Sequence, residues 1–137
     1  GLKSLNQASY IPANKSQAAV QMAELAYVYV PAKCDGNFDQ CRLHINYHGC
    51  RGSGAYGPSV YGYNQWAETN SIVVLYPQAA SGPGNPTGCW DWTGITGKDF
   101  DTKTGAQLLT VHNMIAGLPN ATLSPVKSMV APMQRGV

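Results

Sequence analysis

Charge is scarce in this sequence, and its two signs nearly balance. Asp, Glu, Lys and Arg make up only 12% of the 137 residues, and the formal net charge is +2. The basic residues are scattered, whereas nucleic-acid-binding proteins carry a basic stripe that neutralises phosphates. We therefore expect no nucleic-acid partner.

Long apolar runs and an initiator methionine are also missing. No run approaches the roughly 20 apolar residues of a membrane-spanning helix, so we expect no membrane span. The sequence begins at Gly1 without a signal-type apolar region, which predicts a mature or excised segment. Its length suits one domain, or part of one, but is short for a hydrolase with helices on both faces of its sheet.

Two kinds of catalytic motif are absent. A Gly-x-Ser-x-Gly nucleophile elbow does not occur between Gly1 and Val137. The cysteines form no Cys-x-x-Cys pair and have no histidines at ligand spacing, which argues against structural zinc. We therefore expect no metal site and no cofactor.

Four cysteines are present, and they can pair in three ways. Cys34 and Cys41 flank a short polar loop between two strand-like stretches, which favours a local disulfide and leaves Cys50 to pair with Cys89. Disulfides of this kind persist in oxidising compartments and therefore favour secretion.

Two Asn-x-Ser/Thr triplets begin at Asn14 and Asn120. Such triplets are acceptors for N-glycosylation in secreted proteins, although they often arise by chance. We regard both asparagines as candidate glycosylation sites, in keeping with a secreted, extracellular protein.

The chain is predicted to form one α/β unit with three regions. Residues 1–25 are expected to be an irregular lead-in with a short helix over 17–25, residues 26–118 the core, and residues 119–137 a tail. Within the core we expect strands over 26–30, 43–47 and 72–76, and helices over 62–70 and 105–118.

The predicted strand over 72–76 indicates the architecture. It is apolar at every position, as a strand buried on both faces of a sheet requires. Together with the preceding strand and the helix over 62–70, whose Trp66 is expected to face inward, it predicts a parallel crossover. The fold class is therefore α/β with parallel central strands and covering helices.

The strand over 43–47 stops at His48, Gly49 and Cys50, where the backbone is expected to turn sharply. An exposed turn of this kind suits an oxyanion hole, in which backbone N–H groups face a reacting carbonyl. His48 is expected to brace this turn rather than to act as a catalytic base.

Several blocks of uncommon residues carry a resemblance to a known family. They are His48-Gly49-Cys50, the run from Gly62 to Asn70, Leu75-Tyr76-Pro77-Gln78, and the run from Asn85 to Trp92 that contains Cys-Trp-Asp-Trp. In this order, over about residues 25–118, the chain resembles secreted poly(3-hydroxybutyrate) depolymerases. The resemblance implies an α/β-hydrolase fold and a Ser-Asp-His triad that cleaves the polyester or its oligomers through an acyl-enzyme.

The resemblance also implies roles for individual residues. The backbone N–H of Cys50, next to Gly49, would donate to the oxyanion, while the Cys50 sulfur is held in a disulfide with Cys89. Trp90 would contact the substrate, with its ring on polymer methyl groups and its indole N–H near an ester oxygen. Trp92 is a further expected substrate contact. The family block continues with two aromatic residues where this chain has Thr93 and Ile95, so its substrate groove is expected to differ in shape.

Two residues of these blocks can be read in more than one way. Tyr63 is expected either to contact substrate or to pack in the core. Asp91 is more simply a structural carboxylate that holds the tryptophan loop than a general base, because the base in this chemistry is histidine.

The resemblance further predicts where the missing triad lies. Some members of the family are circularly permuted, and in them the serine, aspartate and histidine all precede the oxyanion block. No strand or elbow follows Leu118 here, so this chain matches the C-terminal portion of a permuted enzyme. Its partner would be the missing N-terminal segment, in the same polypeptide or as a companion chain.

Two alternatives remain open. A self-contained triad of Ser53, His112 and either Asp91 or Asp101 is disfavoured, because Ser53 lacks the strand-to-helix elbow. A secreted binding or structural protein that kept the fold without the triad is the alternative to an esterase. Upstream sequence with an elbow would distinguish the two.

Overall fold

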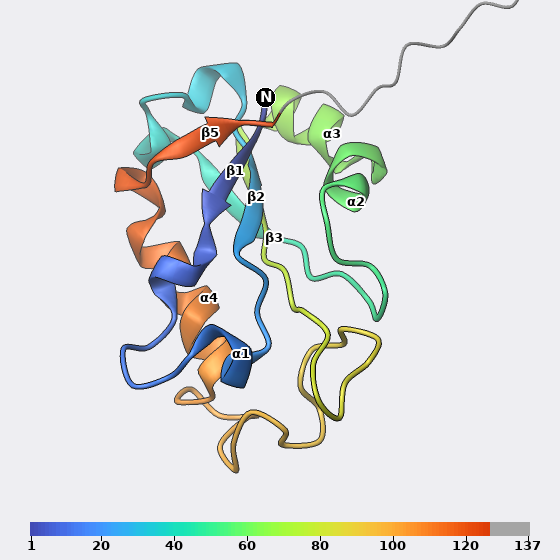
Figure 1. Cartoon of the computed structure of the whole chain (residues 1–137). Helices are drawn as coiled ribbons and strands as arrows, with labels where there is room; N and C mark the ends of the chain where they lie inside the picture. Colours follow the sequence, from blue (N-terminus) through green and yellow to red (C-terminus); the bar gives the residue numbers. More distant parts are fainter. Residues whose placement is uncertain (127–137) are drawn as a thin grey trace, which may run out of the picture.

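Five strands form a single mixed sheet in the computed structural model, which describes residues 1–126 (Figure 1). The strands are β1 (Leu2–Asn6), β2 (Leu25–Tyr29), β3 (Arg42–Ile45), β4 (Ile72–Tyr76) and β5 (Leu123–Pro125), in the spatial order β3-β4-β2-β1-β5. The three strands predicted from the sequence are β2, β3 and β4.

Only β3 and β4 run parallel, with Leu43 opposite Val73 and Ile45 opposite Leu75. The predicted crossover between them is confirmed, because helical segments join the two strands. The wider prediction of parallel central strands is wrong, since β4 pairs antiparallel with β2, and β1 pairs antiparallel with β2 and β5. Connection length alone does not decide this, since β1 and β2 are also joined through helical segments and still pair antiparallel.

Four α-helices accompany the sheet: α1 (Gln17–Val20), α2 (Tyr56–Val60), α3 (Tyr63–Asn70) and α4 (Ala106–Gly117). Short 3₁₀ turns, η1 (Gln7–Tyr10), η2 (Ala32–Cys34), η3 (Phe38–Gln40) and η4 (Leu118–Asn120), lie in the connections. Helix α1 starts at Ser16, whose hydroxyl accepts the N–H of Ala19, and stops at Gln21, which has a positive φ of 52°. This left-handed residue makes α1 shorter than the predicted 17–25.

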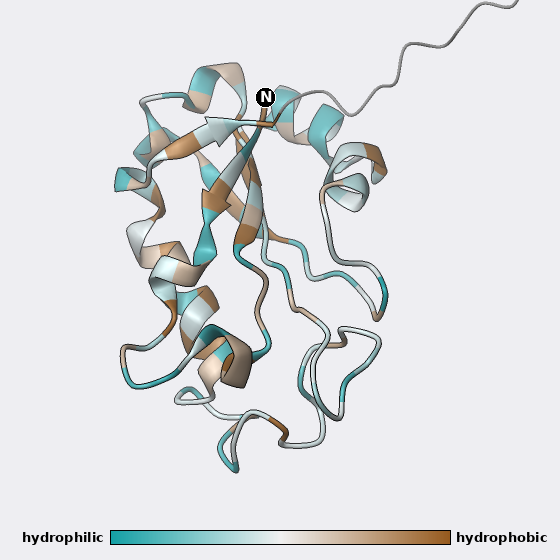
Figure 2. Cartoon of the chain, in the orientation of Figure 1, coloured by the Kyte–Doolittle hydropathy of each residue, from teal (hydrophilic) through white to brown (hydrophobic). Residues whose placement is uncertain are grey.

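The apolar run of β4 serves two cores. Val73 and Leu75 belong to the larger cluster, which contains Val111 and Met114 of α4, while Val74 packs in a smaller cluster with Ala67 of α3. Because successive side chains of a strand point to opposite faces, α4 and α3 cover opposite faces of the sheet. Figure 2 shows the apolar residues, in brown, concentrated on the strands, while the long loops below the sheet are mostly pale or teal.

The regions at the two ends differ from the prediction. Residues 2–6 of the expected irregular lead-in form β1, which pairs with β2 along its whole length. Lys3 and Ser4 hide this strand in the sequence, because they break the apolar alternation that marks a strand. The expected tail contributes β5, which pairs with β1, while its part beyond residue 126 lies outside the described residues.

The orientation of α3 also corrects the prediction. Trp66 is 68% exposed rather than inward, and Ala67 is the residue that meets the sheet. Glu68, the next residue, accepts hydrogen bonds from the Tyr29 hydroxyl and the Ala32 amide, which sets the helix rotation. Core packing as the role of Tyr63 is excluded as well, since that side chain is 44% exposed.

Within residues 1–126, none of the helices has the length and apolar character needed to cross a membrane. The longest, α4, has 12 residues. At 1.5 Å of rise per residue, this length spans roughly 18 Å, well short of a bilayer core of about 30 Å.

The two-sided burial of β4 predicts the effect of truncating it. Leu75 is fully buried, so Leu75→Ala should lower the free energy of unfolding by about 3 kcal/mol. Leu43→Ala on β3 is the matched control, because Leu43 is 38% exposed and its loss should cost about 1 kcal/mol or less. Urea unfolding followed by circular dichroism would compare them, and equal losses would contradict the assigned position of β4.

Candidate active-site loops

Two loops without regular ladders meet at one edge of the sheet. The loop over 46–55 follows β3, and the loop over 77–105 follows β4. Because β3 and β4 are parallel, their carboxyl ends lie side by side, and ligands commonly bind at this edge of α/β sheets. The disulfide between Cys50 and Cys89 joins the two loops directly, and the second predicted disulfide, Cys34–Cys41, is also present.

The turn after β3 is fixed by His48, which is buried. Its Nε2 accepts the N–H of Ala79 at 3.0 Å, and its Nδ1 lies 2.7 Å from the carbonyl oxygen of Gly49. An acceptor at Nε2 requires the proton to sit on Nδ1, which therefore donates to Gly49. Both ring nitrogens are occupied within the chain, so neither is free to take a proton from a nucleophile.

The backbone amides that follow His48 differ in whether they have a hydrogen-bond acceptor. The amide of Arg51 donates to Thr87 O at 2.7 Å, and that of Gly52 donates to Gly49 O at 3.0 Å. Within the part of the chain that the structure describes, no acceptor pairs with the amide of Cys50. This N–H is therefore available to an external oxygen.

Buried glutamine side chains form hydrogen bonds with the backbone of both loops. The sequence analysis did not predict this role. Gln78, 2% exposed, accepts the amide of Gly54 through Oε1 at 2.6 Å. Gln7, which follows β1, is fully buried. Its side-chain Nε2 donates to the carbonyl oxygen of Gln78, and its Oε1 accepts the amide of Gln78. Gln107 of α4 accepts the amide of Asp91 at 2.8 Å. The only signal in the sequence was a glutamine in an otherwise apolar block, as at Gln78.

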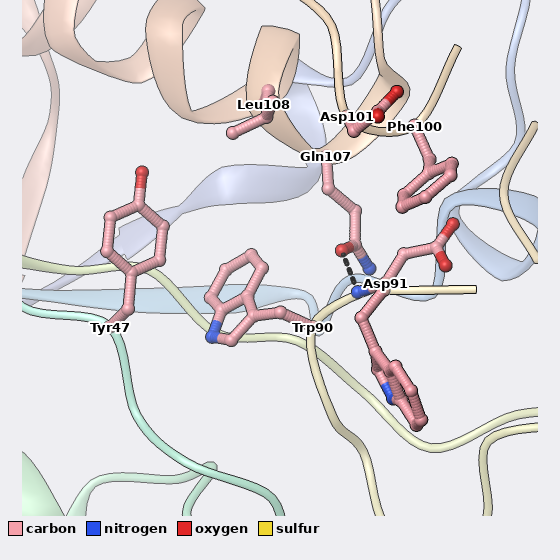
Figure 3. A pocket seen from close by; sticks show the side chains of 8 residues that line it. Tyr47, Trp90, Asp91, Phe100, Asp101, Gln107 and Leu108 are labelled. Carbon is pink, nitrogen blue, oxygen red and sulfur yellow. Dashed lines mark hydrogen bonds between the residues drawn. The ribbon is translucent and has the colours of Figure 1, made fainter. Parts of the chain in front are cut away.

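Trp90 forms one wall of an open cavity of about 520 Å³ (Figure 3). Tyr47 packs edge-on against it with ring centroids 5.0 Å apart, and Leu108 of α4 lies across the space. The indole Nε1 of Trp90 is buried and has no hydrogen-bond partner within residues 1–126. Trp92, 76% exposed, also lines this cavity.

Asp91 organises the loop that follows Trp90. Its carboxylate accepts five hydrogen bonds, from the amides of Thr93, Gly94, Ile95 and Thr96 and from the Thr96 hydroxyl. Burial alone would raise the pKa of Asp91, but these donors outweigh it and lower the pKa from 3.8 to about 2. The carboxylate is thus an ionised anchor of the loop.

Tyr63 lies apart from Trp90. It lines a smaller cavity of about 270 Å³ together with Tyr61, Asn46 and the turn at His48 and Gly49. Of the two candidate cavities, the structure therefore brings Trp90 and Trp92 together in one and places Tyr63 in the other.

The other candidate residues named from the sequence form neither a catalytic triad nor a metal site within residues 1–126. No hydrogen bond within residues 1–126 joins Ser53 or His112 to another member of the disfavoured triad. The same residues contain no group of three or more His, Cys, Asp or Glu side chains that could hold a metal ion. The candidate glycosylation sites Asn14 and Asn120 are both exposed.

Comparison with known proteins identifies relatives of this arrangement, although no family model matches the chain. The chain is 33% identical to a poly(3-hydroxybutyrate) depolymerase of Delftia acidovorans over 138 residues, covering 94% of this chain and 28% of that protein. It is 36% identical to a polyhydroxybutyrate depolymerase of Talaromyces funiculosus over 115 residues, covering 73% of this chain and 34% of that protein.

Solved structures agree with these relatives. A PHB depolymerase complexed with an R3HB trimer superposes with a TM-score of 0.68 at 33% identity, covering 81% of this chain and 38% of that one. The PHB depolymerase from Penicillium funiculosum gives a TM-score of 0.66 at 32% identity, covering 83% and 39%. The mixed sheet with its helices is thus similar to that of these α/β-hydrolase-like enzymes.

Over most of its length the chain is similar to poly(3-hydroxybutyrate) depolymerases. It spans about a third of the length of the curated relatives that it matches. The blocks that carried the sequence resemblance are the two loops that meet at the Cys50–Cys89 disulfide.

The pKa of Asp91 predicts an acid-sensitive loop. A carboxylate whose folded pKa is about 2, below its ordinary 3.8, stabilises the fold above about pH 4 and loses this contribution as the pH falls toward 2. Asp91→Asn should therefore cost about 2 kcal/mol at neutral pH and flatten the pH dependence of stability in that window. Thermal unfolding between pH 2 and 7 would measure both.

Asp101→Asn is the matched control for this prediction. Asp101 lines the same cavity but is exposed, and its carboxylate accepts no hydrogen bond from residues 1–126. Its replacement should leave the pH profile of unfolding close to that of the unmodified protein. Parallel pH profiles for Asp91→Asn and the unmodified protein would contradict the assigned role of Asp91.

Proposed function

We propose that this chain is the C-terminal portion of a secreted serine esterase that hydrolyses poly(3-hydroxyalkanoate), its oligomers or short-chain esters through an acyl-enzyme. The amide of Cys50, which has no hydrogen-bond partner within residues 1–126 and is fixed beside the Trp90 cavity, is the observation that carries this proposal. Two disulfides fit an oxidising, extracellular location.

Cys50 supplies the oxyanion hole in this proposal. When a serine attacks an ester carbonyl, negative charge develops on the carbonyl oxygen, and a donor that already points there lowers the barrier. The disulfide to Cys89 and the hydrogen bonds of Arg51 and Gly52 hold the turn, so Cys50 and Gly49 need not reorganise during the reaction. One such donor contributes on the order of 3 kcal/mol.

Trp90 and Trp92 contact the substrate. The walls of their cavity are mainly apolar and can cover the methyl groups of a 3-hydroxybutyrate chain. The Trp90 indole N–H is itself buried, so an ester oxygen would reach it only after a local shift of the tryptophan loop. A related depolymerase has been solved with an R3HB trimer bound, which supports a substrate of this class.

The serine, aspartate and histidine lie outside this chain, in the upstream segment expected of a circularly permuted enzyme. The absence of an elbow motif and the limited coverage of the relatives support this arrangement. His48 braces the hole, because both of its ring nitrogens bind backbone groups. Asp91 holds the tryptophan loop through four backbone amides and the Thr96 hydroxyl. Asn14 and Asn120 would carry glycans during secretion.

Labelling of the native protein tests the serine esterase. After purification from culture medium, a fluorophosphonate probe should modify a serine outside residues 1–137, in the same polypeptide or in a companion chain that copurifies. Intact mass after reduction would locate the adduct. If only an unlabelled chain of this length is recovered, a binding or structural protein without the triad is the better description.

Trp90→Phe tests the substrate contact, because phenylalanine keeps an aromatic wall but loses the indole N–H. The complete enzyme should lose roughly tenfold in kcat/KM on a 3-hydroxybutyrate trimer, the equivalent of one hydrogen bond. The substitution should remove no hydrogen bond from the folded state, because the Trp90 indole has no hydrogen-bond partner within residues 1–126. Trp66→Phe is the control, because Trp66 is exposed on α3 and lines neither cavity, and it should leave kcat/KM unchanged.

A further inference from the structure

A short segment of the loop after β4 is attached to the Cys50 turn at two points. The segment runs from Asn85 to Cys89. One attachment is the disulfide between Cys89 and Cys50, and the other is the carbonyl oxygen of Thr87, which accepts the amide of Arg51 at 2.7 Å. Because one segment makes both contacts, its position sets the position of the turn.

Asn85 holds this segment through its side-chain amide. Its Oδ1 accepts the backbone N–H of Cys89 at 2.9 Å, and its Nδ2 donates to the Cys89 carbonyl oxygen at 2.8 Å. One side chain therefore binds both backbone groups of the disulfide-bonded cysteine. Asn85 is only 6% exposed, so little water can compete for these hydrogen bonds.

Gln21 in turn holds Asn85. Its Oε1 accepts a further hydrogen bond from Asn85 Nδ2 at 3.0 Å, and its Nε2 donates to the carbonyl oxygen of Pro83 at 2.9 Å. Gln21 ends α1 in the left-handed conformation, which glycine adopts without strain. A glycine would relieve the backbone but lose both contacts, which gives a physical reason for a glutamine at this position.

This network fixes the surroundings of the Cys50 amide without using the amide itself. The sulfur of Cys50 and the amide of Arg51 are both bound, while the Cys50 N–H has no acceptor within residues 1–126. Asn85 lines neither the Trp90 cavity nor the cavity of Tyr63. It can therefore act on a reaction at the turn only through the segment that it holds.

We propose that Asn85 is the positioning residue for the oxyanion donor. It orients Cys89, and the disulfide and the Thr87 carbonyl transmit that orientation to the Cys50 N–H. A donor lowers the barrier only if it already points to the place where negative charge develops, so its support is part of the catalytic device. This inference rests on the proposed function, in which the Cys50 N–H stabilises the transition state.

Asn85→Asp replaces one nitrogen of this network by oxygen. The new oxygen faces the acceptors Cys89 O and Gln21 Oε1, while the bond from the Cys89 N–H is kept. In the complete enzyme, kcat on a 3-hydroxybutyrate trimer should fall roughly tenfold to a hundredfold, part of the loss for a deleted oxyanion donor. KM should change by less than about twofold, because the donor acts on the transition state.

Asn113→Asp is the matched control. Asn113 of α4 also donates from its side-chain amide to a backbone carbonyl, that of Tyr10, at 3.0 Å, and it lines neither cavity. The substitution makes the same exchange of nitrogen for oxygen away from the turn, so kcat should not change. Equal losses of kcat in the two variants, or a raised KM with kcat intact in Asn85→Asp, would overturn the inference.

Amide hydrogen exchange, resolved by residue, reads the positioning without catalysis. In the complete protein, Asn85→Asp should make the Arg51 amide exchange roughly tenfold faster, because its hydrogen bond to Thr87 O opens locally. The amides of β4 report global stability and should accelerate less. Equal acceleration at Arg51 and in β4 would show a merely structural asparagine and contradict the positioning role.

Gln21→Glu provides a second variant in case Asn85→Asp does not fold. Its Nε2 becomes an oxygen that faces the Pro83 carbonyl, while its Oε1 still accepts from Asn85. Because this change is one contact further from Cys89, kcat should fall only about threefold with KM unchanged, less than the full value of a hydrogen bond. If this is the variant that folds, an unchanged kcat rules out the network as a support of the donor.

The two proposals fail separately. A protein that hydrolyses no ester and is never labelled by a fluorophosphonate removes the esterase, whereas faster local exchange at Arg51 would still support Asn85 as the residue that positions the turn. A labelled enzyme with the same kcat in Asn85→Asp as in the unmodified protein retains the esterase and loses the positioning role.

Discussion

The site depends on buried side-chain amides that replace missing secondary structure. The loops over 46–55 and 77–105 have no ladder to hold them, and their backbone groups must still be paired where they are buried. Gln78 and Gln107 provide these partners from inside the core, and Gln7 in turn fixes the backbone of Gln78. The Cys50–Cys89 disulfide then joins the two loops covalently, so the turn at Cys50 and the side chain of Trp90 are fixed relative to each other.

The position of the two joined loops follows from the single parallel strand pair, β3 and β4. Because β3 and β4 end at the same edge, the two loops emerge side by side although their disulfide partners lie 39 residues apart. The alternation of β4 places α3 on one face and α4 on the other, which leaves this edge open to ligands. A fold with β3 and β4 antiparallel would send the two loops to opposite ends.

Local patterns predicted much of the fold because their causes are local. β-branched and aromatic runs marked β2 and β4, and a glycine-containing polar loop marked Cys34–Cys41. Predictions failed where distant contacts decide. β1 has a weak pattern and forms because β2 and β5 flank it, and Trp66 faces outward because the small Ala67 and the acceptor Glu68 set the rotation of α3.

Residue identity and order along the chain were enough to predict the resemblance to poly(3-hydroxybutyrate) depolymerases and the strand that leads to His48-Gly49-Cys50. They were also enough to name residue types suited to an oxyanion or a polyester. The three-dimensional arrangement was needed to show that, within residues 1–126, the Cys50 amide and the Trp90 indole have no hydrogen-bond partner, and that Tyr47 lines two cavities. The reason is physical: whether a polar group is free or satisfied depends on neighbours that arrive from distant parts of the chain.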